Sequence, residues 1–135
     1  MKWKPYDYAR KRTEECSIDW PMRKTASLLI KEDIGSMLVK DAAGKYVGML
    51  TDKIILKAIS DGVDLADKTV GDLQLEPLIY VNKNAGIDEV MMKFKETPSG
   101  RLVMVDEDGR AVAVLKKKNI DRFSIFHTVN RILRR

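Results

Sequence analysis

The chain has 135 residues, of which 44% are hydrophobic and 33% are charged, and its formal net charge is +5. A chain of this length and composition forms one domain or two half-domains that share a core, which excludes an intrinsically disordered protein. It contains no apolar run near the ~18 residues that span a bilayer, and its single cysteine, Cys16, excludes an intramolecular disulfide and a cysteine-based zinc site.

The first half of the chain predicts five regular elements. They are a strand at residues 14–18, a helix at 21–30, strands at 36–40 and 45–50, and a helix at about 52–60. Pro21 suits the first position of a helix, and Gly62 suits the residue that ends one. The first strand is polar, so we expect it at an exposed sheet edge. The apolar residues that the first helix turns toward the core are Met22, Ala26, Leu29 and Ile30.

The second half predicts the same order of elements. They are a strand at residues 78–81, a helix at 85–96, strands at 102–105 and 111–115, and a helix from about 117. Gly109 allows the tight turn between the last two strands, because glycine readily adopts a positive φ. The apolar residues that the helix at 85–96 turns toward the core are Ile87, Val90, Met91 and Phe94.

One segment of the sequence occurs twice, and the two copies align without a gap at a spacing of 65 residues. Residues 41–51 align with residues 106–116, and the lead-in at 6–8 aligns with 71–73. A single copy buries too little apolar surface to be stable alone, so the copies should pack on each other, and a ligand is expected at the seam between them. The division that follows is a first repeat with its lead-in at 1–62, a linker at 63–76, a second repeat at 77–123 and a basic amphipathic helix at 124–135.

The repeated pattern resembles a CBS domain, and two such domains in tandem resemble a CBS pair, or Bateman module. The residues that carry the resemblance are 37–41 and 45–51 in the first copy, 102–106 and 110–120 in the second, and the entry segment 69–73. The resemblance implies an α/β (α+β) fold of two βαββα repeats about a pseudo-twofold axis, and a homodimer. It also implies a cleft between the repeats that binds AMP, ADP, ATP or S-adenosylmethionine, with no reaction catalysed and no catalytic cofactor.

The ligand motif of the family is a Thr or Ser after the last strand, followed three residues later by Asp. The hydroxyl and the N–H groups at the start of the helix can hold a phosphate, and the carboxylate can accept hydrogen bonds from ribose hydroxyls. The first copy keeps Thr51 but has Ile54 at the acidic position. The second copy has Lys116 and Asn119 instead, so we expect the ligand there. A solvated charge run at a helix start is the alternative interpretation of the lysines at 116–118.

Further candidate ligand residues lie where strands begin. Arg101 could hold a phosphate with its two-pronged guanidinium, and its counterpart in the first copy is Ser36. An ordinary surface arginine at a strand end is the alternative for Arg101. The side chains that could enclose a base are Met37, Ile79 and Tyr80, although such apolar residues commonly belong to the core. No catalytic pair and no metal site stands out, and His127 has no nucleophile to serve.

Three functions remain open at this level. The first is a regulatory sensor of an adenosine-containing ligand whose state an effector protein reads, and the second is a ligand-free scaffold that dimerises and docks partners. The third and weakest is nucleic-acid binding. It is suggested by the excess positive charge at the ends of the chain, in Arg10-Lys11-Arg12 and in Arg131, Arg134 and Arg135. That role calls for basic residues interleaved with aromatic ones. The C-terminal helix, with Ser124 near its cap, is expected to pack on its own module or to form a dimer contact.

Overall fold

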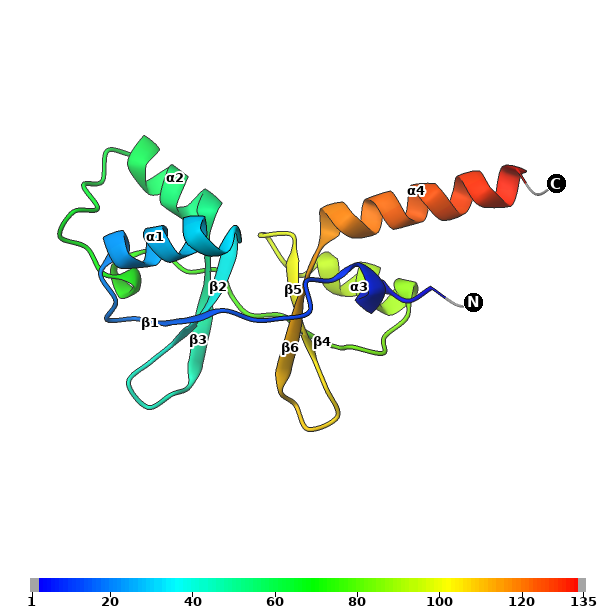
Figure 1. Ribbon diagram of the computed structural model, residues 1–135, viewed down its shortest axis with the longest axis horizontal. Helices are drawn as coiled ribbons and strands as arrows, with labels where there is room; N and C mark the ends of the chain where they lie inside the picture. Colours follow the sequence, from blue (N-terminus) through cyan, green and yellow to red (C-terminus); the bar gives the residue numbers. More distant parts are fainter. Residues whose placement is uncertain (1–2, 134–135) are drawn as a thin grey trace. The chain divides into compact units, whose positions relative to one another are not determined.

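Each copy of the repeated segment forms a three-stranded sheet with its helices, as the sequence predicts (Figure 1). The computed structural model describes residues 3–133, and for residues 123–130 it describes the backbone alone. The elements in chain order, with η for a 3-10 helix, are η1 (Pro5–Tyr8), β1 (Glu15–Ser17), α1 (Met22–Glu32), β2 (Ser36–Lys40), β3 (Tyr46–Thr51), α2 (Asp52–Ser60), η2 (Val70–Asp72), β4 (Tyr80–Asn82), α3 (Ile87–Phe94), β5 (Arg101–Val105), β6 (Ala111–Lys116) and α4 (Lys117–Leu133).

The two sheets have the same topology. Their strand orders are β1-β2-β3 and β4-β5-β6, and in each the first pair is parallel and the second antiparallel. The antiparallel register shifts between Val39 and Lys40 in one sheet, and between Met104 and Val105 in the other. These irregularities are 65 residues apart, so the copies are equivalent down to the bulge. Gly109 has a φ of +79°, as predicted for its hairpin, and its counterpart Gly44 has a φ of +82°.

The cores form where the sequence predicts them, with one exception on α1. Met22 and Leu29 are buried, and Thr25 joins them, but Ile30 is 82% exposed. The expectation that Ile30 faces the core was wrong. Seven residues make nearly two full helical turns, so Leu29 lies above Met22, whereas Ile30 is rotated about 100° further. In the second copy, Val90 and Phe94 of α3 are buried.

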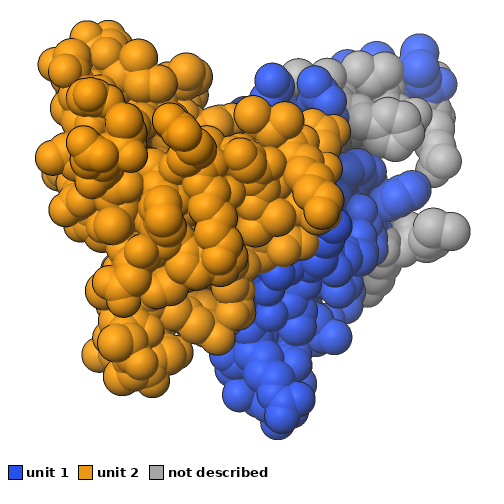
Figure 2. All heavy atoms as spheres, turned by 60° about the vertical axis from the view of Figure 1, so that its left-hand side comes forward, with its two compact units in different colours: residues 1–13, 79–135 blue, residues 14–78 orange. Residues whose placement is uncertain are grey.

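The two compact units do not coincide with the two halves of the sequence. Unit 1 comprises residues 1–13 and 79–135, and unit 2 comprises residues 14–78 (Figure 2). Arg10 and Val114 exchange two backbone hydrogen bonds of 3.0 Å within unit 1. Within unit 2, Glu76 and Met49 exchange two of 2.8 and 2.9 Å. Met49 and Val114 are repeat counterparts, so each copy's sheet is extended by the lead-in segment of the other copy.

Side chains of the lead-in segments complete both cores. Tyr6 and Tyr8 pack against the buried cluster of unit 1, while Val70 is fully buried in the cluster of unit 2. Each segment turns through a 3-10 helix closed by an aspartate, in which the backbone N–H of Lys4 or Thr69 donates to the side chain of Asp7 or Asp72 at 2.9 Å. The compact units thus group the chain differently from the repeats of the sequence, because residues 1–13 fold with the second repeat and residues 69–76 pack on the first.

The C-terminal region also differs from the expectation. One continuous helix, α4, replaces the predicted break at residue 124, and Ser124 lies inside it. In the first copy α2 stops at Ser60, and Gly62 follows with a φ of +85°. His127 occupies the position of Gly62 in the second copy, so no residue suited to a left-handed conformation ends α4 there. Most of the apolar residues expected on one face of this helix lie in residues 123–130, whose side chains the structure does not describe. The last two apolar residues of that face, Ile132 and Leu133, are exposed. No helix among the described residues is long and apolar enough to cross a membrane.

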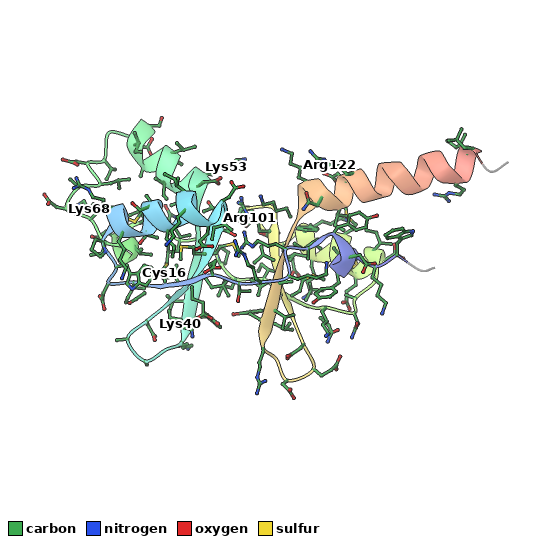
Figure 3. All side chains as sticks on the ribbon, viewed as in Figure 1. Cys16, Lys40, Lys53, Lys68, Arg101 and Arg122 are labelled. Atoms are coloured by element: carbon green, nitrogen blue, oxygen red, sulfur yellow. The ribbon has the colours of Figure 1, made fainter. Side chains whose placement is uncertain are left out.

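A polar cluster ties together the three strands of the first sheet. The Glu15 carboxylate lies 2.7 Å from the Lys40 ammonium and accepts a hydrogen bond from the Tyr46 hydroxyl (Figure 3 labels Lys40). Burial raises the pKa of Glu15, but the hydrogen bonds from Lys40 and Tyr46 outweigh it and hold that pKa below its usual value. The carboxylate of Glu15 therefore holds the polar edge strand predicted for residues 14–18 to the other two strands of the sheet.

Replacing Glu15 with glutamine should make the stability of unit 2 less dependent on pH. A carboxyl group with a lowered folded-state pKa stabilises the protein above the pKa of its unfolded state, and this contribution is lost as the pH falls through the folded-state value. We expect Glu15→Gln to cost about 1 kcal/mol or less at pH 7, because both partners are partly exposed. The difference should shrink as the pH falls below 4.5, the ordinary pKa of a glutamate, toward the lowered pKa of Glu15. Urea denaturation followed by circular dichroism measures it, with Glu96→Gln at the surface pair with Lys93 as control. A pH-independent difference would contradict the prediction.

Candidate functional site

The candidate ligand residues lie at two equivalent strand–helix junctions, one in each unit. In unit 2, Ser36 begins β2 and is the register partner of Thr51, which ends β3. In unit 1, Arg101 begins β5 and is the register partner of Lys116, which ends β6. The helix starts at the next residue in both copies. The first N–H of each helix donates to the carbonyl of the residue just before the paired strand, from Asp52 to Gly35 before β2 at 3.0 Å and from Lys117 to Gly100 before β5 at 2.8 Å.

The junction of unit 2 is neutral and buried. The Thr51 hydroxyl accepts a hydrogen bond from the Ile54 N–H at 3.2 Å and so caps the N-terminus of α2. Thr51 and Ser36 are 2% and 0% exposed, and Met37 belongs to the buried cluster of this unit. The hydroxyl that sequence reasoning assigned to a phosphate thus already has a structural partner, and Met37 is a core residue.

The junction of unit 1 carries a concentration of positive charge. Arg101 and Lys116 are partly buried and lie directly opposite each other on adjacent strands (Figure 3 labels Arg101). Like charges in this arrangement destabilise a sheet. Lys117 and Lys118 follow, both exposed, and the first turn of α4 contains no acidic residue to offset the positive end of the helix. This concentration of positive charge has the sign that an anionic ligand requires.

Asn119 connects this junction to the N-terminal lead-in. Its side-chain amide donates to the Tyr8 carbonyl at 3.2 Å, although the two residues are 111 positions apart. The amide nitrogen therefore holds the lead-in against α4, and the side-chain oxygen is the atom suited to accept from a ribose hydroxyl. Sequence reasoning selected Asn119 but missed Tyr8, because nothing in the local pattern indicates a contact over this separation.

The remaining candidates divide between core and surface. Ile79 packs against the buried cluster of unit 1, whereas Tyr80 on the edge strand β4 is 41% exposed, and partial burial raises its pKa. Unit 1 thus holds Ile79, Tyr80, Arg101, Lys116 and Asn119, and unit 2 holds Ser36, Met37 and Thr51. Burial raises the pKa of the Cys16 thiol to about 11, so that group stays protonated. No three His, Cys, Asp or Glu side chains within the described part of the chain are grouped to hold a metal ion.

Substitutions of Thr51 should separate a capping role from a ligand role. Thr51→Ala removes the hydroxyl that caps α2 and Thr51→Ser keeps it, while both variants remove the buried methyl group of Thr51. We therefore expect Thr51→Ala to be about 1 kcal/mol less stable to unfolding than Thr51→Ser. Chemical denaturation of the two variants in the absence of any ligand measures this difference. Equal stabilities of Thr51→Ala and Thr51→Ser would show that the hydroxyl does not cap the helix.

Comparisons with known proteins bear on this fold and site. The CBS domain family matches residues 7–61 and 70–125. Hypoxic response protein 1 of Mycobacterium tuberculosis is 29% identical over 105 residues, which cover 77% of this chain and 73% of that protein. Among solved structures, the CBS domain pair of protein MJ0100 in complex with 5′-methylthioadenosine and S-adenosyl-L-methionine has a TM-score of 0.71 at 23% identity, covering 90% of this chain and 98% of that one.

The CBS domain protein PAE2072 from Pyrobaculum aerophilum, complexed with AMP, has a TM-score of 0.68 at 17% identity, covering 87% of this chain and 89% of that one. At these identities the two structures establish the fold alone. The family match covers both copies and most of the chain. The resemblance drawn from the repeated segment is thereby confirmed: the chain belongs to the CBS domain family and contains two CBS domains in tandem.

Proposed function

We propose that this CBS pair is a cytoplasmic regulatory protein that binds one adenosine-containing ligand per chain and catalyses no reaction. The observation that carries the proposal is the opposed pair Arg101 and Lys116, which stands where the first copy has the neutral pair Ser36 and Thr51. Two cations brought together at a strand–helix junction favour a bound anion. The adenosine-containing ligands of the MJ0100 and PAE2072 structures support the ligand class.

Each residue of the unit 1 junction has a role in this proposal. Arg101 and Lys116 hold the phosphate together with the N–H groups at the start of α4, and the side-chain oxygen of Asn119 accepts from the ribose. Tyr80, partly exposed on the edge strand, lies against the base. The positive charge favours AMP, ADP or ATP over S-adenosylmethionine, whose sulfonium is itself a cation.

Regulation requires that the ligand stabilise one state of the protein more than another. The bond from Asn119 to Tyr8 offers such a coupling, because it joins the ribose-binding residue to the lead-in segment. A ligand that fixes the Asn119 side chain favours the state in which the lead-in is docked on unit 1. An effector protein would then respond to the docked or released lead-in.

A ligand-free scaffold is the second candidate, and one specific observation favours it. The outer face of α1 and α2 exposes Ile30, Leu56 and Ile59, and it includes an open, mainly apolar groove of about 430 Å³ bordered by Ile55, Ile59 and Val63. An exposed apolar face of this kind suits a homodimer contact. The scaffold hypothesis predicts dimers by analytical ultracentrifugation whether or not a nucleotide is present.

Thermal unfolding with added ligand distinguishes the two candidates. AMP, ADP or ATP at millimolar concentration should raise the melting temperature of the full chain, and a ligand at 100 times its Kd adds about 2.7 kcal/mol of stability. The double variant Arg101→Ala with Lys116→Ala should lose at least tenfold in affinity by titration calorimetry. The double variant Lys53→Ala with Lys95→Ala, at exposed lysines of units 2 and 1 outside the unit 1 junction, is the matched control and should retain the shift. If none of the three nucleotides raises the melting temperature, the scaffold replaces the sensor.

A further inference from the structure

The two units differ sharply in charge. Unit 1 contains 17 Lys and Arg residues and 8 Asp and Glu residues, a net charge of +9, whereas unit 2 contains 8 and 12, a net charge of −4. Both basic ends of the chain belong to unit 1, because the lead-in folds with the second repeat (Figure 2). The modest charge of the whole chain therefore conceals one strongly basic unit.

Aromatic rings lie among the cations of this unit. The ammonium groups of Lys11 and Lys83 are 5.0 and 5.8 Å from the centre of the Tyr6 ring, so two segments far apart in sequence place a cation on the same ring. Trp3 is 44% exposed and packs against Tyr8, with ring centres 5.9 Å apart. We name the surface formed by Trp3, Tyr6, Lys11 and Lys83 the basic–aromatic face.

The start of α4 adjoins this face through the lead-in. Asn119 donates to the carbonyl of Tyr8, whose ring contacts Trp3. The exposed Lys117 and Lys118 lie immediately before Asn119, and the exposed Arg122 lies one turn further along α4 (Figure 3 labels Arg122). The lead-in itself adds the exposed Lys4. Cations from the lead-in and from the residue after β4 thus lie on the Tyr6 ring, and the start of α4, which is bonded to the lead-in, carries further exposed cations.

We propose that the basic–aromatic face binds single-stranded nucleic acid. Cations alone would suit any polyanion, but the exposed ring of Trp3 suits unpaired bases, which can stack on aromatic side chains. A duplex hides the faces of its bases, so it would use the charges and not the rings. The sequence shows basic residues at the chain ends, and the fold supplies the interleaved aromatic residues that this function requires.

Fluorescence anisotropy with the full chain tests the proposal. The probes are labelled 20-nucleotide oligo(U) and oligo(dT), and a duplex of the same length, in 50 to 300 mM NaCl. We expect the single strands to bind more tightly than the duplex and their affinity to fall with salt, with a log–log slope of about −3 for contact with about four phosphates. Lys11→Glu with Lys83→Glu should weaken oligo(U) binding at least tenfold, and Trp3→Ala about fivefold.

A matched charge reversal in unit 2 is the control. Lys24→Glu with Lys31→Glu makes the same change in net charge at two exposed lysines, and Lys24 also lies over an aromatic ring, 3.8 Å from the centre of Trp20. This control should bind oligo(U) within twofold of the unchanged protein. Circular dichroism and melting temperatures show that each variant is folded. The face shares no residue with Arg101 and Lys116, so a nucleotide-dependent thermal shift that survives Lys11→Glu with Lys83→Glu separates this proposal from the sensor function.

Four results would overturn the proposal. The first is the absence of oligo(U) and oligo(dT) binding at 100 μM protein and 50 mM NaCl. The second is equal loss of binding in the unit 2 control. The third is undiminished oligonucleotide binding by Trp3→Ala together with equally tight binding of heparin, which would identify a site for polyanions in general. The fourth is a preference for vesicles containing phosphatidylserine over oligonucleotides, which would identify a membrane surface.

Discussion

Two pairs of backbone hydrogen bonds, from Arg10 to Val114 and from Glu76 to Met49, join each sheet to the lead-in segment of the other copy. Neither core is complete without this exchange, since Val70 is fully buried in unit 2 and Tyr8 covers the core of unit 1. The exchange also explains a difference between the copies. A Cβ atom on Gly48 would lie 2.9 Å from the Cβ of Leu75, so the lead-in on β3 requires glycine there, whereas the equivalent residue of β6 is Ala113. The repeated segment therefore folds as an interlocked pair.

The exchange of lead-in segments also determines which unit carries the positive charge on which the proposed functions depend. The two basic ends of the chain are collected in unit 1, and the Asn119–Tyr8 bond joins the lead-in to the candidate nucleotide junction. The two strand–helix junctions occupy equivalent positions in the two copies but carry different side chains. Thr51 caps a helix beside a buried serine, whereas Lys116 faces Arg101 across the sheet. The duplicated fold thus has one neutral, capped junction and one junction with two opposed cations, on which the proposed nucleotide site depends.

Much of the fold could be predicted from local patterns. The repeat spacing, the turns at Gly44 and Gly109, and the end of α2 before Gly62 depend on neighbouring residues and were confirmed. The exchange of lead-in segments could not be predicted, because Arg10 and Val114 are far apart in sequence and form a single bridge without a periodic pattern. For the same reason the sequence proposes Lys116 and Asn119 by residue type alone and gives no indication of Tyr8, the partner of Asn119. The exposure of Ile30 depends on the phase of one helix, which apolar spacing defines only loosely.

Backbone nuclear Overhauser effects in the full chain test the interlocked arrangement most directly. Cross-strand effects between protons a few ångströms apart identify which residues pair in a sheet. We expect effects between Arg10 and Val114 and between Glu76 and Met49. Effects between Arg10 and Met49, and between Glu76 and Val114, would place each lead-in on its own copy and contradict the exchange of lead-in segments.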